Sequence, residues 1–288
     1  MATRPFVDTH IHYWDLKDEN LRYVWLERDW VHPILGNIDG LKVLRYMAEE
    51  YIGETRFQNV SKIVHVQAAI GIADPVEETR WLQEQADRTG FPHGIVGHCD
   101  LMEGNAEETL ERHLEYANFR GVRDFAAGTN LDNPDWLRGL SLLVPHNLVF
   151  CIDTVWDQMT EVARAADETG ATICIDHAGF PRERTDEYLA NWKHGMAEAA
   201  KSEHVICKIS GLGMCDNRWT IDSLRPYVLG CIEAFGVDRC VMGTNWPVDR
   251  LYSSYGDVLE AYETLIADFS DAEQTALFSA NAERIFRV

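Results

Sequence analysis

The feature that most constrains the fold is an alternation of short β-branched runs with amphipathic helical stretches along the chain of 288 residues. The runs that read as strands lie at residues 6–12, 60–69, 94–100, 119–125, 148–153, 171–177, 204–210 and 239–245. Helical periodicity lies between them, for example at residues 75–89, 106–117, 156–169 and 186–201. Strands that alternate with helices predict a parallel sheet, and eight such units in a chain of this length predict a closed barrel.

We therefore expect an α/β fold consisting of a single (β/α)8 TIM barrel that occupies residues 1–288 as one domain. The alternative is an open, doubly wound sheet, but no Gly-x-Gly-x-x-Gly turn follows the first strand, which argues against it. Additional C-terminal helices, at residues 254–268 and 271–286, are expected to close the barrel. Ser270 and Glu273 have the spacing of a capping box at the start of the last helix.

Charge and cysteine content narrow the class of partner. The formal net charge is −21, and a field of that sign repels nucleic acid and anionic membranes. The seven cysteines include no CxxC pair, which favours reduced thiols over a disulfide framework. With no apolar run long enough to span a bilayer and no room for a signal peptide, we expect a cytoplasmic enzyme. Its expected partner is a small-molecule substrate; homo-oligomerisation stays open.

Polar residues at strand ends are the candidates for chemistry, because the active site of a barrel enzyme lies at the C-terminal ends of its strands. His10 and His12 end the first strand, and their i, i+2 spacing points both imidazoles to one face. His177 closes the sixth strand and Asn245 closes the eighth. Two adjacent imidazoles are ready ligands for a metal or a substrate.

Further candidates follow from the other strands and from one long irregular segment, residues 13–39. A loop of that length in a compact barrel is usually a lid or a wall of the site. The residues expected to bind substrate are Arg123, Gln67, Lys208, Trp14 and Trp25. Arg123 is suited to a carboxylate because its guanidinium forms a bidentate fork.

Five segments taken together resemble the amidohydrolase superfamily: VDTHIHYWDL, GVRDF, IDHAGFP, CKISGLG and RCVMGTNWPVD. They are most similar to its lactonase-like branch, which includes sugar-lactone hydrolases and pyrone-dicarboxylate lactonase. The resemblance implies that His10, His12 and His177 surround the substrate carbonyl and that an aspartate ending strand eight activates the attacking water. Here that position is Asn245, and an amide cannot take a proton at neutral pH. We expect Asp153, at the end of strand five, or one of the histidines to take the proton instead.

The resemblance also raises the question of a metal. Strand four offers Arg123 where a two-metal centre needs a bridging carboxylate. We therefore expect at most one metal, held by His10, His12 and His177, so that the cofactor is either none or one divalent ion such as zinc or manganese.

The function that the sequence favours is a hydrolase that opens a lactone or related cyclic ester of a small polar or anionic substrate. Two alternatives stay open: a lyase such as a decarboxylase of the same superfamily, and a catalytically degenerate barrel that binds a ligand without turnover. The departure at Asn245 motivates the second alternative.

Overall fold

The computed structural model describes residues 4–32, 34–125 and 127–288. Its centre is an eight-stranded sheet in which the strands follow one another in chain order, and the paired strands are all parallel. The strands are β1 Phe6–Ile11, β4 Val60–Val66, β5 Gly94–His98, β6 Phe119–Arg123, β7 Val149–Ile152, β8 Thr172–Ile175, β9 Val205–Ile209 and β10 Cys240–Met242. A separate antiparallel pair is formed by β2 Trp14–Asp15 and β3 Arg45–Tyr46.

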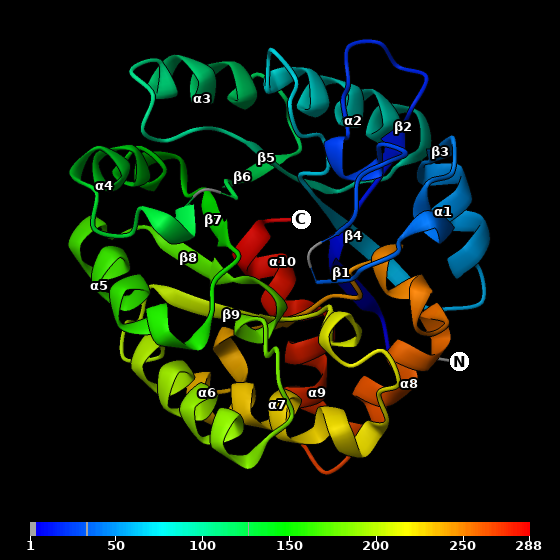
Figure 1. The fold of residues 1–288 in the computed structure, drawn as a ribbon, viewed down its shortest axis with the longest axis vertical. Coiled ribbons are helices and arrows are strands. Elements are labelled where there is room, and N and C mark those ends of the chain that lie inside the picture. The colour runs from blue at the N-terminus through cyan, green and yellow to red at the C-terminus, as the bar shows by residue number, and fades with distance from the viewer. Residues whose placement is uncertain (1–3, 33, 126) are drawn as a thin grey trace.

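The sheet closes on itself just beyond the ends of its first and last strands. Ile11 forms a parallel bridge with Trp246, and the backbone N–H of His12 donates to the carbonyl oxygen of Trp246 at 2.8 Å. Figure 1 shows the resulting ring of strands surrounded by helices. The prediction of a single (β/α)8 barrel is confirmed.

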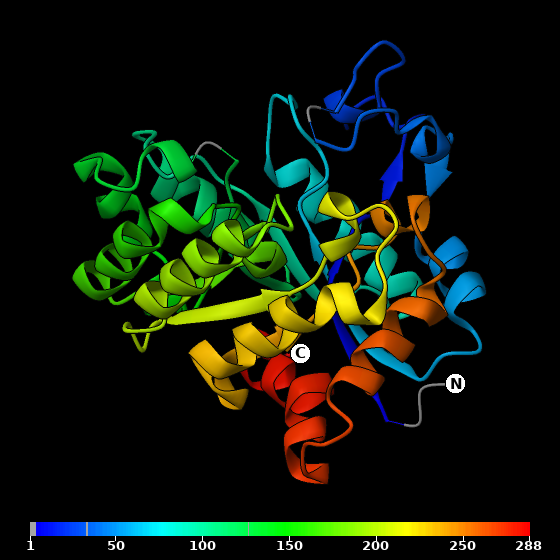
Figure 2. The same cartoon turned by 60° about the horizontal axis from the view of Figure 1, so that its bottom comes forward.

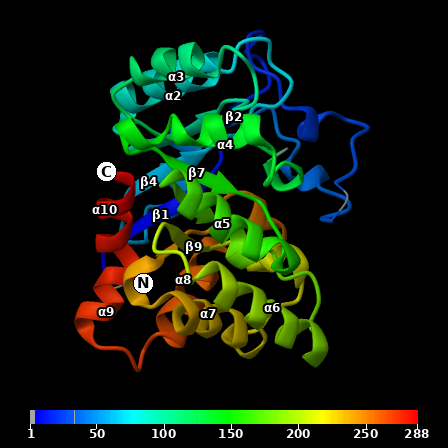
Figure 3. The same ribbon diagram turned by 90° about the vertical axis from the view of Figure 1, so that its left-hand side faces the viewer.

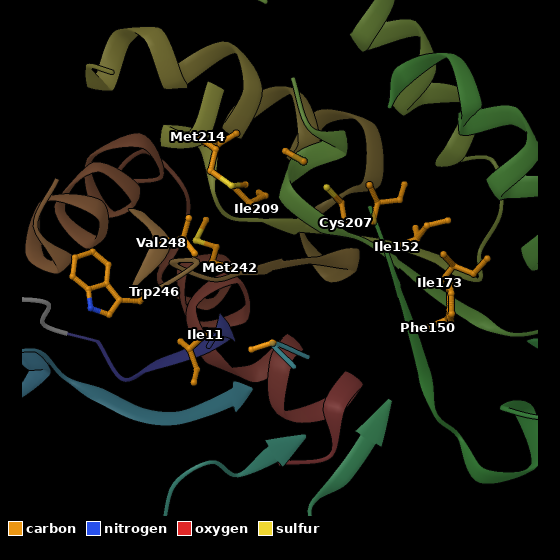
Figure 4. Close-up of a cluster of buried hydrophobic side chains, with 14 of the residues drawn as sticks. Ile11, Phe150, Ile152, Ile173, Cys207, Ile209, Met214, Met242, Trp246 and Val248 are labelled. Atoms are coloured by element: carbon orange, nitrogen blue, oxygen red, sulfur yellow. The ribbon is translucent and has the colours of Figure 1, made fainter. Parts of the chain in front are cut away.

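Helices cover the outside of the barrel. They are α1 Ala48–Thr55, α2 Val76–Thr89, α3 Ala106–Leu114, α4 Pro134–Ser141, α5 Met159–Thr169, α6 Asp186–Ala199, α7 Ile221–Phe235 and α8 Tyr255–Leu265. Outward-facing strand residues such as Ile152, Ile173 and Ile209 are fully buried against this helical layer (Figure 4). This layer is the main hydrophobic core.

A second apolar cluster lies inside the barrel, at the end covered by the C-terminal helix. Its strand residues include Val64, Val149, Cys174 and Val241, and Phe286 of the last helix completes it. The chain from Ser270 onward forms α9 Asp271–Thr275, a π-helical turn Ala276–Ala280 and α10 Asn281–Phe286, and the predicted capping box at Ser270 is present. In Figure 2 and Figure 3 these helices lie at one end of the barrel, while the long segment after β1 lies at the other. The C-terminal helix therefore closes the barrel, as predicted.

The predicted strands are too long at their C-terminal ends, and this difference matters for the site. β8 ends at Ile175 and β10 ends at Met242, so His177 and Asn245 lie in the loops that follow. Both residues have left-handed backbone conformations, with φ of 53° at His177 and 59° at Asn245. Such conformations are costly for non-glycine residues and concentrate at functional sites. A pattern of apolar residues cannot show where the chain leaves the sheet.

Candidate active site

A cavity of about 460 Å³ opens at the C-terminal ends of the strands. Much of its polar lining lies at or just after the ends of the strands: His12, Gln67, Arg123, Asp153, His177 and Asn245. Loops and turns add His32, Thr154, Gln158 and Arg182. Its apolar lining is mostly supplied by loops: Trp25, Trp30, Ile34, Leu35, Phe125, Phe180, Met214 and Val248. This is the end of the barrel at which barrel enzymes carry out their chemistry.

A β-bulge in β1 aims the first two histidines into the barrel. Three residue steps in β1, from Asp8 to Ile11, oppose only two in β4. Val7 belongs to the interior cluster and Ile11 to the outer core, although strict alternation would place both on the same face. The extra residue reverses the alternation, and His10 and His12 then face inward. The sequence predicted their common face but not this cause.

The two imidazoles meet through their Nε2 atoms, which lie 3.2 Å apart. Nδ1 of His12 lies 2.8 Å from the carbonyl oxygen of Val66, so this nitrogen carries the ring proton. Nδ1 of His10 faces the carboxylate of Asp176 at 3.7 Å. A separation of 3.7 Å does not fix the tautomer of His10. The gap between the two Nε2 atoms can therefore hold either a hydrogen bond from His10 to His12 or a metal ion.

This geometry fits a metal ion. Two nitrogen ligands of a tetrahedral zinc ion, each bonded at about 2.0–2.1 Å, lie about 3.3 Å apart. The carbonyl oxygen of Val66 and the carboxylate of Asp176 are the type of outer partner that orients metal-binding imidazoles. Burial lowers the pKa of His10 and His12 well below the ordinary value, so both rings are neutral and able to coordinate. The two imidazoles therefore suit one divalent ion. The ligand set expected from the sequence also included His177, but the three histidines do not form a compact ligand group among the described residues, so that set stays a prediction.

The side chain of His177 lies next to that of His10, although it comes from the turn after β8. Its ring centroid lies 4.4 Å from that of His10, its Nδ1 lies 3.0 Å from Oγ of Ser210, and its Nε2 lies 3.7 Å from Oδ1 of Asp153. Burial lowers its pKa as well, although the carboxylates of Asp153 and Asp176 oppose the shift. The structure thus brings together the three histidines and the aspartate that the sequence singled out.

Arg123 lines the cavity with its charge already balanced. Its Nη1 lies 3.6 Å from Asp153 and 4.0 Å from Asp176, and its Nη2 donates to the carbonyl oxygen of Gln67. The guanidinium also stacks on the ring of Phe125 at 4.3 Å. Because two carboxylates lie beside it, Arg123 offers a substrate hydrogen bonds more than net positive charge.

Lys208 was expected to bind substrate, but it lies beneath the cavity and is fully buried. Its Nζ lies 2.8 Å from Oδ1 of Asp176 and 3.4 Å from Sγ of Cys151. Burial alone would raise the pKa of Asp176, but Lys208 and His10 hold it well below its ordinary value. Among the described residues, Cys151, Cys174 and Asp176 form a group compact enough for a metal. The ammonium group of Lys208 already lies against this group, so we do not assign a metal to it.

Two aromatic candidates have different places. Trp25 lines the cavity and donates from its indole nitrogen to the carbonyl oxygen of Ala68 at 2.8 Å. Trp14 is fully buried behind it, with ring centroids 5.6 Å apart, and does not line the cavity. Trp14 therefore supports the wall that Trp25 presents.

Asn245 lines the cavity and is paired with an acid that the sequence reasoning missed. Its Nδ2 donates to Oδ2 of Asp249 at 2.7 Å. Asp176 was also missed, although it directly precedes His177. Strand alternation from Cys174 places Asp176 inside the barrel, and the left-handed turn then returns His177 to the same side. The alternation was the available signal for Asp176; nothing in the sequence indicated Asp249.

Comparisons with known proteins identify the family of the chain. A profile of the amidohydrolase family matches residues 7–288. The chain belongs to this family. Protein y4mH of Sinorhizobium fredii, which is uncharacterised, is 36% identical to this amidohydrolase over 302 residues and is matched over 100% of both chains. An L-fucono-1,5-lactonase of Burkholderia multivorans is 27% identical, over 97% of the amidohydrolase and 95% of the relative.

Solved structures extend the likeness to the fold. A crystal structure of an amidohydrolase from Burkholderia multivorans with bound zinc has a TM-score of 0.83 and 25% identity, with 99% of each chain covered. The zinc is a property of that protein. In the part of this amidohydrolase that the structure describes, no helix is long and apolar enough to cross a membrane.

Proposed function

We propose that this amidohydrolase hydrolyses a lactone of a small, neutral, hydroxylated substrate, with Asp153 as the general base. The observation that carries the proposal is the position of Asp153, whose carboxylate borders the cavity beside His177 and Arg123. It is the cavity-lining carboxylate among the described residues. A base must reach the attacking water, and this is the acid that borders the space for one.

The proposed reaction needs one water and one ring ester. Asp153 takes a proton as the water oxygen bonds to the lactone carbonyl carbon. The ring C–O bond then breaks, and the same proton passes to the leaving oxygen, which gives a hydroxy acid. His12 and His177 border the carbonyl, and Arg123 donates hydrogen bonds to it or to a ring hydroxyl. A divalent ion held by His10 and His12 would polarise the carbonyl oxygen as a Lewis acid.

Charge balance favours a neutral substrate over a dianion. In the floor of the site, Arg123 and Lys208 are matched by Asp153 and Asp176, and the histidines are neutral. The apolar wall supplies flat surfaces, such as Trp25 and Phe180, against which the face of a sugar ring can pack. The relative named L-fucono-1,5-lactonase makes L-fucono-1,5-lactone the first substrate to test.

The test is a panel of sugar 1,4- and 1,5-lactones in water enriched in oxygen-18. We expect one of them to be opened, with one oxygen-18 atom in the new carboxylate. Release of carbon dioxide from hydroxybenzoates or related acids, with no lactone opened, would support the lyase alternative. Saturable binding of lactones with no turnover would support the degenerate barrel.

A further inference from the structure

Asp249 does not line the cavity, and among the described residues it is linked to the lining by its hydrogen bond with Asn245. Asp249 lies in the 3₁₀ turn Val248–Leu251 after β10 and is 3% exposed. Its Oδ2 accepts from Nδ2 of Asn245 at 2.7 Å, and its Oδ1 accepts from the backbone N–H of Gly213 at 3.2 Å. The carboxylate therefore ties the loop after β9 to the loop after β10.

The contact with Gly213 is built into the backbone. A Cβ atom on Gly213 would lie 2.6 Å from Oδ1 of Asp249, and the side chains of Trp219 and Tyr252 would lie 3.3 Å from it. Any residue other than glycine would push the carboxylate away. The loop after β9 therefore fits closely around the carboxylate of Asp249. A loosely held acid at the surface would not need a glycine at this position.

This carboxylate fixes which end of the Asn245 amide faces the cavity. Both oxygens of Asp249 accept hydrogen bonds, from Asn245 and from Gly213, so the amide nitrogen is the end that faces the carboxylate. Burial raises the pKa of Asp249 to about 7, so this orientation belongs to the ionised carboxylate, which is the main form above that pH. The amide nitrogen is thus engaged away from the substrate. Since Asn245 lines the cavity, the group left for a ligand is its carbonyl oxygen, Oδ1.

We propose that Asp249 is a positioning residue, which holds Asn245 with Oδ1 toward the cavity as the acceptor for the attacking water. This inference rests on the lactone hydrolysis proposed above. The water donates one hydrogen to Asn245 and the other to Asp153, and only Asp153 takes a proton. Position 245 then orients the nucleophile instead of activating it, which explains how a neutral amide serves where related enzymes are expected to carry an acid.

A double-mutant cycle separates positioning from a structural role. Asn245→Ala removes the acceptor, and we expect kcat on the turned-over lactone to fall about tenfold, the scale of one hydrogen bond in the transition state. Asp249→Ala should lower kcat by a similar factor and leave KM nearly unchanged. Because Asp249 acts through Asn245, Asp249→Ala should cause no further loss of kcat in the Asn245→Ala background. Equal losses in both backgrounds, or none in either, would overturn the inference.

A second measurement does not depend on activity. In ¹⁵N NMR spectra, the side-chain NH₂ of Asn245, assigned by its absence in Asn245→Ala, should exchange slowly with solvent in the wild type and quickly in Asp249→Ala. Fast exchange in the wild type would overturn the inference even if lactones are hydrolysed. Slow exchange with no lactone turned over would leave the positioning intact and reject the lactonase proposal instead.

The exchanged pair Asn245→Asp/Asp249→Asn keeps the inference testable if Asp249→Ala does not fold. The new amide at 249 can still accept from the N–H of Gly213, and it donates to the new carboxylate at 245, so both hydrogen bonds survive and only the one between residues 245 and 249 changes direction. We expect this double variant to unfold at the wild-type temperature. Asn245→Asp alone brings two carboxylates into contact and should unfold at a lower temperature. Because burial raises the pKa of Asp249 to about 7, the comparison is made well above that pH, and a single variant as stable as the wild type there would contradict the contact between residues 245 and 249.

Discussion

The buried ion pair beneath the cavity offers the most demanding test of the structure. Lys208 and Asp176 are both fully buried, and their charged atoms lie 2.8 Å apart. The variant Lys208→Met keeps the length of the side chain and removes its charge. Asp176 is then left in the barrel with the guanidinium of Arg123 at 4.0 Å as its remaining cation.

The expected loss of folding stability in Lys208→Met follows from the burial of the ion pair. Breaking a buried pair by removing one partner costs about 3–5 kcal/mol, because the other charge is left uncompensated. Arg123 offsets part of this, so we expect the lower end, about 3 kcal/mol. For a chain of this length, the unfolding entropy of about 2.1 cal/mol/K per residue converts that loss into a fall in Tm of about 5 °C.

The chain offers a matched control. Lys62 lies 2.7 Å from Glu283, but their side chains are 31% and 42% exposed. Lys62→Met removes the same group from a pair of the same length in contact with water, where such pairs contribute about 0–1 kcal/mol. Thermal unfolding followed by circular dichroism should therefore separate the two variants clearly.

The pH dependence of the stability difference tests the direction in which the pKa of Asp176 is shifted. In the wild type, the lowered pKa of Asp176 contributes stability above the pKa of the unfolded state, and that contribution is lost as the pH falls. Without Lys208, burial dominates and should raise this pKa above its unfolded value. The difference in stability between wild type and Lys208→Met should then shrink as the pH falls from 8 toward 5. A difference that grows on acidification, or a Lys208→Met variant no less stable than Lys62→Met, would refute the buried pair.

Three further variants test the site. Asp153→Asn should lower kcat by about 100-fold or more with little change in KM, the usual scale for losing a general base, and full activity would remove Asp153 from that role. Arg123→Lys should raise KM while the circular dichroism spectrum is retained, because lysine lacks the planar fork; unchanged kinetics would make Arg123 structural. Elemental analysis after dialysis should find no more than one equivalent of zinc or manganese, and less in His12→Ala. Equal metal content in that variant would place the ion elsewhere.

Much of this site could be predicted because chemistry gathers at strand ends. His10 and His12 were found from their spacing, and Asp153 and Asn245 from their position after apolar runs. Each inference needed only the direction of a strand and the rule that parallel strands end together at one rim. The same reasoning predicted eight strands in chain order, since every run was a local signal.

What escaped prediction depends on backbone turns and on contacts between distant loops. The bulge in β1 and the left-handed turn at His177 change the direction in which side chains point, and neither has a sequence signature of its own here. The place of Lys208 was misread for a related reason. Alternation shows that it points into the barrel, but not how deep it lies below the cavity. Depth depends on the stagger of the strands, which the pairing alone determines.

On the proposed lactone hydrolysis, charge would also govern release of the product. Opening a neutral lactone produces a carboxylic acid that ionises at neutral pH, so the substrate and the product differ by one negative charge. Asp153 borders the cavity, the cations of its floor are already paired, and the whole chain carries a net charge of −21. The new anion is therefore held less well than the neutral substrate was. Arg182 lines the outer part of the cavity and is exposed to solvent. On the proposed reaction, the field that would hinder an anionic substrate would thus favour departure of the product, and Arg182 would be the first exposed cation that it meets.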